Sequence, residues 1–355
     1  MFGFRSDGVK VKGLDPIDQM IPHIMSTRND AQNLNTEPIR VENMDKWIKE
    51  KREKEGVSFN YMHIVVAGAV RTYALRQKLN RFVVGGRIYQ RNGLYMSIST
   101  KTALSDDAPE LTTKIRFTGR ESVYEVKEKI DQALKASFEA DRENGSTKVA
   151  TKITSIPNFL VSFGVKFLKL LDRWGMLPKS LINVSPFHTS FFLTNLKSIK
   201  GDYIFHHLYN FGTTGMFVSM GKEKYVPCVN IEQELEVGKV MNLGISTDER
   251  YCDGFYFLKS FRMWKDYLQH PEKMEQELDI EPIESKKERK KRIKQQKRLQ
   301  KKQLKASKKQ LPNTFARLTE DDADRELKVE YKEVDEIITE KREKQENSKK
   351  KVKEK

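Results

Sequence analysis

The basic run at residues 286–309 is the feature that most constrains what this chain can fold into. It holds fourteen Lys or Arg residues and one acid, Glu288, so it carries +13 of the formal net charge of +16. Its few apolar residues cannot bury enough surface to offset the entropy of ordering the chain. We therefore expect a globular domain over residues 1–280 and a charged, low-complexity tail over 281–355 that is disordered or, at best, a solvated helix.

The remaining composition limits the class of protein. The 355 residues are enough to bury a large core, and two cysteines, Cys228 and Cys252, are too few for a disulfide framework. The first residues, MFGFRSDGVKVKG, lack the apolar run of a signal peptide. No stretch reaches the roughly eighteen apolar residues that a membrane-spanning helix needs. We expect a cytoplasmic protein without a transmembrane segment.

The body of the chain mixes helical and strand-like patterns without a regular β-α-β repeat. Helices are expected at about 43–54, 60–78, 122–136, 156–174 and 254–269, and strands at 37–43, beside the Gly85-Gly86 and Asn92-Gly93 hairpin turns, and at 111–119, 189–196, 214–220, 225–231 and 239–248. The last helix is expected to bury Phe255, Leu258, Phe261 and Leu268. No G-x-G-x-x-G or Walker sequence occurs, so we predict an α/β fold with a mixed sheet that is not a nucleotide-binding sheet.

The segment 156–174 combines an apolar side at helical spacing with a charged side. The apolar positions are Ile156, Phe159, Leu160, Phe163, Phe167, Leu170, Leu171 and Trp174, and the charged ones are Lys166, Lys169, Asp172 and Arg173. Two interpretations are open. The segment is a structural helix that covers the sheet, or, because Val161, Val165 and Leu168 widen its apolar side, it contacts a membrane surface or a lipid substrate.

The segment STDERYCDGFYFLKSF at 246–261 predicts a strand that ends in a charged turn, then Asp-Gly, then a helix. It resembles the motif H-x-x-x-D-G of the CoA-dependent acyltransferases, which include chloramphenicol acetyltransferase and the catalytic domain of the 2-oxo-acid dehydrogenase acyltransferases. Asp248, Arg250, Asp253 and Gly254 resemble its D-H-R-x-x-D-G form. The resemblance continues at 58–82 and 191–222 and covers about residues 15–275. It implies an α/β sandwich of the chloramphenicol-acetyltransferase type.

Glu249 stands where this motif has its histidine, the general base that takes a proton from the acceptor. A histidine with a pKa of about 6.5 is roughly two units short of a thiol at about 8.5, whereas a carboxylate at about 4.3 is roughly four units short, or about 5 to 6 kcal/mol. Glu249 remains a base if burial raises its pKa, which the strand alternation allows if the strand continues to residue 249. Pairing with Arg250 would instead hold it ionised.

The resemblance implies roles for three more residues. Thr194 falls where the family has a hydroxyl that hydrogen-bonds the oxyanion of the tetrahedral intermediate, although a threonine is also an ordinary sheet residue. Asp253 would be a structural carboxylate that forms an ion pair with Arg28 and so fixes the active-site strand. Gly254 would permit a sharp turn from strand to helix.

Histidines elsewhere in the chain could replace the missing base. His206 and His207 are adjacent, and if the segment that carries them is a strand, they point to opposite faces, so at most one of them, taken here as His207, could enter the site. The histidines otherwise fit ordinary sheet or interface positions. They lack cysteine or carboxylate companions at ligand spacing, so we expect no metal.

The resemblance implies acyl transfer from a CoA thioester, as co-substrate, to a thiol, hydroxyl or amine of a small-molecule acceptor. It also implies a homotrimer with active sites between subunits. The alternative is a catalytically inactive relative that keeps the fold and acts as a binding or scaffold protein. No lipoyl domain, subunit-binding domain or Ala/Pro-rich linker precedes the body, which argues against membership of a 2-oxo-acid dehydrogenase complex.

The basic run raises a separate question of function. Fourteen cations would attract a polyanion, RNA, DNA or an anionic membrane, in a salt-sensitive and sequence-blind way. No aromatic residue interrupts 285–310 to stack on bases. A solubilising or ribosome-contacting tail is the simpler interpretation.

Overall fold

The computed structural model describes residues 5–101, 110–144, 156–230 and 232–310. The chain divides into two units, 1–286 and 287–355. The described part of the second unit belongs to α9 (Lys286–Gln310), which spans the basic run. Of the two forms expected for this run, a disordered segment or a solvated helix, the structure shows a helix.

A mixed sheet of seven strands forms the centre of the first unit, within the described residues. Its order is β2-β10-β8-β7-β5-β6, and β9 also pairs with β10. The strands are β2 (Gln32–Arg40), β5 (Leu94–Lys101), β6 (Glu110–Phe117), β7 (Phe191–Asn195), β8 (Met216–Met220), β9 (Lys224–Val229) and β10 (Leu235–Asp248). β7 runs parallel to β5 and to β8, and the other pairs are antiparallel. The prediction of an α/β fold with a mixed sheet is confirmed.

A small sheet in the order β1-β4-β3 stands apart from the main one. Its strands are β1 (Gly8–Lys10), β3 (Arg81–Val84) and β4 (Arg87–Arg91). The hairpin predicted at Gly85-Gly86 joins β3 to β4, and both glycines have positive φ, 57° and 71°, as a tight two-residue turn requires. The hairpin predicted at Asn92-Gly93 is wrong, because β4 and β5 lie in different sheets and the turn carries the chain between them.

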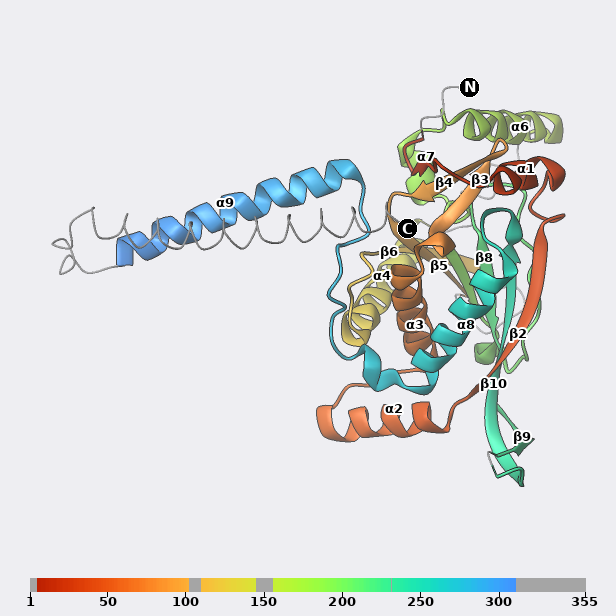
Figure 1. The fold of residues 1–355 in the computed structure, drawn as a ribbon, viewed down its shortest axis with the longest axis vertical. Coiled ribbons are helices and arrows are strands. Elements are labelled where there is room, and N and C mark those ends of the chain that lie inside the picture. The colour runs from red at the N-terminus through yellow and green to blue at the C-terminus, as the bar shows by residue number, and fades with distance from the viewer. Residues whose placement is uncertain (1–4, 102–109, 145–155, 231, 311–355) are drawn as a thin grey trace, which may run out of the picture. The chain divides into compact units, whose positions relative to one another are not determined.

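Helices cover the main sheet. They are α3 (Tyr61–Leu75), α4 (Val123–Asn144) and α8 (Gly254–Gln269). Helix α2 (Glu42–Glu55) packs against α8, and the shorter helices α1 (Pro16–Ile24) and α7 (Lys179–Val184) lie elsewhere in the unit. Figure 1 shows α3, α4 and α8 in front of the sheet. α3 begins at a capping box, since Asn60 and His63 each accept the other's backbone N–H, at 3.0 and 3.2 Å. Almost all of its side chains are buried, so it is the central helix of this layer.

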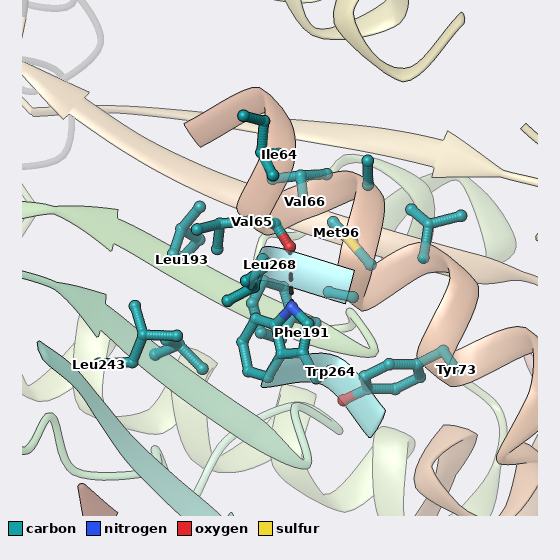
Figure 2. Close-up of a cluster of buried hydrophobic side chains, with 14 of the residues drawn as sticks. Ile64, Val65, Val66, Tyr73, Met96, Phe191, Leu193, Leu243, Trp264 and Leu268 are labelled. Atoms are coloured by element: carbon teal, nitrogen blue, oxygen red, sulfur yellow. Dashed lines mark hydrogen bonds between the residues drawn. The ribbon is translucent and has the colours of Figure 1, made fainter. Parts of the chain in front are cut away.

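The core lies between α3, α8 and the sheet (Figure 2). Trp264 of α8 donates its indole N–H to the Val65 carbonyl at 3.1 Å and meets the Phe191 ring of β7 edge-on at 5.6 Å. Gly68 makes this approach possible, because a Cβ there would lie 2.9 Å from the Trp264 ring. The indole therefore joins two helices and the sheet in one contact.

The bounds predicted for α8 are confirmed, but its buried side is only partly as expected. Phe261 and Leu268 are buried, whereas Phe255 is 70% and Leu258 50% exposed. The buried stripe runs instead through Phe257, Phe261, Trp264 and Leu268, at successive three- and four-residue steps.

Helix α6 (Asn158–Trp174) lies at the end of the unit opposite β9 (Figure 1). The interpretation that its apolar side covers the sheet is wrong, because Phe159, Phe163 and Phe167 are 72%, 68% and 49% exposed. The part of the chain that the structure describes contains no helix long and apolar enough to cross a membrane.

Candidate active site

The expected site lies where β10 gives way to α8. β10 ends at Asp248, a single 3₁₀ turn covers Glu249–Tyr251, and α8 begins at Gly254. Asp253 is the N-cap of α8, and its carboxylate accepts the Tyr256 N–H at 2.8 Å. The steric role predicted for Gly254 is wrong, because a Cβ there would meet nothing within 4 Å. The strand, turn and helix are those that the sequence predicts, and the cap at Asp253 is a finding of the structure.

A buried cluster of two arginines and one carboxylate fixes the end of β10. Arg250 donates its Nε and a terminal N–H to the two carboxylate oxygens of Asp248, each at 2.8 Å. Arg28 Nε lies 3.5 Å from the same carboxylate, and Arg28 also donates to the Tyr209 and Gly212 carbonyls, both at 2.8 Å. Burial lowers the pKa of Arg28 even though Asp248 opposes the shift. This cluster ties residue 28, the loop at 209–212 and the end of β10 together.

The pairing predicted between Arg28 and Asp253 is therefore corrected. Among the described residues, Asp248 is the carboxylate that Arg28 meets, and Asp253 is exposed and occupied as a helix cap. The physical reason is position. Asp248 is the last residue of the buried strand, whereas Asp253 begins a helix at the surface.

Glu249 is half-buried, and its carboxylate accepts a hydrogen bond from the side-chain amide N–H of Asn33 at 2.5 Å. Its backbone N–H donates to Ala31 at 3.0 Å. Because β10 ends one residue earlier, the strand alternation that would have buried Glu249 with Ile245 does not extend to it. The sequence did not predict Asn33 as a partner of Glu249, because no local pattern indicates a contact between residues so far apart along the chain.

Thr194 is half-buried near the end of β7. Within a single chain it lies far from Glu249. Thr194 is in register with Ser219 of β8, which is in register with Gly244 of β10. Glu249 lies five residues beyond Gly244, or about 16 Å along the strand direction at about 3.3 Å per residue. A site that uses both residues would therefore have to combine Glu249 of one copy of the chain with Thr194 of another.

His207 is exposed, and the segment that carries it is not a strand, so the predicted alternation of His206 and His207 is wrong. His206 stacks on the Phe217 ring at 3.9 Å, and burial lowers the pKa of His206. His207 lies 5.2 Å from the Tyr209 ring. These contacts are those of surface aromatic packing.

A cavity of about 420 Å³ opens beside the buried cluster. Arg28, Lys169, Arg173 and Arg250 line it together with one acid, Asp172, and Glu249 is not among its lining residues. Its walls thus carry an excess of positive charge. Residues 5–101, 110–144, 156–230 and 232–310 include no group of three His, Cys, Asp or Glu placed to hold a metal ion.

Comparison with known protein families gives one match, to part of the chain. The sequence model of the 2-oxoacid dehydrogenases acyltransferase (catalytic domain) matches residues 189–275. No curated protein sequence matches the chain significantly.

Many solved structures are similar to it, and three of them illustrate the likeness. A probable dihydrolipoamide acetyltransferase from Listeria monocytogenes 4b F2365 has 14% identity and a TM-score of 0.47, over 73% of this chain and 94% of that one. A truncated catalytic core of the 2-oxoacid dehydrogenase multienzyme complex from Thermoplasma acidophilum has 14% identity and a TM-score of 0.43, over 74% and 99%. A chloramphenicol acetyltransferase has 10% identity and a TM-score of 0.41, over 74% and 99%. The resemblance found in the sequence is confirmed by the family match: residues 189–275, which hold Thr194, Glu249 and the Asp253-Gly254 pair, carry the catalytic-domain pattern of the 2-oxoacid dehydrogenase acyltransferases.

Proposed function

We propose that this protein transfers an acyl group from a CoA-type thioester to a thiol, hydroxyl or amine acceptor, as a homotrimer whose sites lie between subunits. The observation that carries the proposal is the separation of Glu249 from Thr194. Both residues lie within the matched segment, at positions to which the sequence resemblance gives these roles. The register of β7, β8 and β10 keeps them about 16 Å apart along the strand direction within one chain. Two copies would let the Glu249 of one subunit meet the Thr194 of the next.

Each residue then has a defined task. The Glu249 carboxylate takes the proton of the acceptor, whose heteroatom attacks the thioester carbonyl. The Thr194 hydroxyl donates to the oxyanion that forms. The intermediate expels the CoA sulfur, which recovers the proton from Glu249. Asp248, held by Arg28 and Arg250, fixes the strand end that presents Glu249.

The cavity beside this cluster would suit the anionic part of CoA. Its lining cations outnumber its single acid, so a diphosphate would find complementary charge there. A subunit contact over Glu249 would supply the burial that a single chain lacks, and burial is what makes a carboxylate a stronger base.

The second candidate is an inactive relative that binds a CoA thioester or a partner protein without transfer. It is favoured by the surroundings of Glu249, a half-exposed carboxylate that accepts an amide N–H.

A thiol-release assay with acetyl-CoA and a panel of acceptors separates the two candidates. Under the first, the wild type turns over, Glu249→Gln and Thr194→Ala each lose at least about a hundredfold in kcat, and the matched surface change Glu232→Gln has no effect. Light scattering should give the mass of a trimer. Turnover that appears only in Glu249→His, with acetyl-CoA binding intact in the wild type, would establish the inactive relative instead.

The contact of the basic run with a polyanion is a separate proposal, supported by its charge of +13 over residues 286–309. Removal of residues 287–355 should abolish salt-sensitive binding to RNA and leave the first unit folded. Retention of binding by the truncated protein would contradict it.

A further inference from the structure

Helix α6 presents its apolar side outward. Six residues form what we call the α6 strip, and their exposed fractions range from 38% to 72%: Phe159, Leu160, Phe163, Phe167, Leu170 and Trp174. At 100° per residue these positions occupy an arc of about 100° on the helix. An ordinary surface helix turns such an arc toward the core, so the exposed strip needs another explanation.

The orientation of α6 is fixed by its one acidic residue. Asp172 is buried, and Arg5 donates to its carboxylate at 2.8 Å and to its backbone carbonyl at 2.6 Å. His188 Nε2 lies 3.4 Å from the same carboxylate. Burial alone would raise the pKa of Asp172, but His188 and the Arg5 charge outweigh it and lower that pKa. The acid thus points into the protein, which turns the α6 strip away from it.

The charges that remain at the surface of α6 are all positive. Lys166, Lys169 and Arg173 are exposed, and they lie together along one side of the α6 strip. A second copy of the same face would bring like charges together, which disfavours self-association through it. An anionic surface would meet both the cations and the apolar residues favourably.

We propose that α6 binds the surface of an anionic lipid bilayer, with the α6 strip at the boundary between headgroups and acyl chains. Aromatic and leucine side chains on one face, with Lys and Arg beside them, are the composition of helices that lie in this interface. The proposal uses none of the residues given a chemical step, Glu249, Thr194 and Asp253, but Lys169 and Arg173 also line the cavity assigned to CoA. It makes the protein a peripheral membrane protein.

Tryptophan fluorescence of the full chain tests this directly. Of the three tryptophans, Trp47 and Trp264 are 6% and 3% exposed, whereas Trp174, in the strip, is 45% exposed. Phosphatidylcholine vesicles containing phosphatidylglycerol should shift the Trp174 emission to shorter wavelength, and brominated acyl chains should quench it. Vesicles of phosphatidylcholine alone should do so much less.

A matched pair of variants completes the test. Phe163→Ser with Phe167→Ser should lower the partition coefficient measured by the emission shift about a hundredfold, since each buried ring contributes about tenfold. Tyr225→Ser with Leu235→Ser, which removes side chains at least as exposed from β9 and β10, should leave it unchanged.

Two results would overturn the proposal. Co-sedimentation with vesicles without any change in Trp174 emission would mean that the basic run binds lipid and α6 does not. A shift that occurs without vesicles and grows with protein concentration would mean that a second copy of the chain covers the α6 strip.

Discussion

Replacement of Asp248 by Asn removes the one anion of the buried cluster and changes almost nothing in shape. Arg28 and Arg250, whose side chains are 6% and 5% exposed, would then face each other's charge without a carboxylate between them. Removing one partner of a buried ion pair typically costs about 3 to 5 kcal/mol of stability. We expect the free energy of unfolding of Asp248→Asn to fall by that amount.

Asp253→Asn is the matched control, because the same change is made five residues later. Asn caps a helix as well as Asp does, and the charge of an exposed cap contributes about 0.3 to 1 kcal/mol through the helix dipole. The two variants should therefore differ by at least about 2 kcal/mol.

Urea unfolding at neutral pH, followed by circular dichroism, measures both variants. If Asp248→Asn is too unstable to purify, Arg28→Met with Asp248→Asn removes one of the uncompensated charges and should recover part of the loss. The reasoning is refuted if Asp253→Asn is the more damaging change, since Arg28 would then pair with Asp253 as the family resemblance implies.

Two further predictions concern the rest of the fold. Burial lowers the pKa of Lys114 to about 7 although its ammonium donates to the Ile182 and Ser185 carbonyls, so the folded protein binds fewer protons than the unfolded chain above that pH. Its stability should rise with pH by about 2 kcal/mol between pH 7 and 9 relative to Lys114→Met in parallel urea titrations, and equal pH profiles would contradict this. Gly212→Ala should lose several kcal/mol, because φ is +83° and a Cβ would collide with the Phe187 carbonyl, whereas Gly13→Ala, at φ +67° with open space, should lose only about 1 to 2 kcal/mol in thermal melts. Similar losses for the two glycine variants would contradict the predicted clash.

The sequence predicted the longer helices and most strands because their patterns are local, whereas the short helices α1 and α7 were not predicted. α8 begins at Gly254 and ends at Gln269 as predicted, since an apolar stripe and a following proline mark it within twenty residues. The assignment of β4 and β5 to two sheets could not be predicted, because an Asn-Gly turn between two strands looks the same whether or not they pair.

The sequence names candidate site residues, but it does not predict their contacts. Glu249 and Asp253 belong to a contiguous motif. The contact of Arg28 with Asp248 depends instead on where the end of β10 lies in three dimensions. Asn33 reaches Glu249 only because β2 pairs with β10, with Asn33 opposite Thr247. Such partners depend on the register of strands that are far apart in sequence.

The first unit does not end with α8. Leu278 and Ile283 donate their backbone N–H groups to the Arg120 and Thr118 carbonyls, both at 2.8 Å, and Arg71 donates to the Lys273 carbonyl at 3.1 Å. The stretch after the matched segment is thus a strap that closes over the start of α4. An expression fragment that stops at residue 275 would leave the Arg120 and Thr118 carbonyls without these donors, so the smallest autonomous piece of this protein should extend to about residue 286.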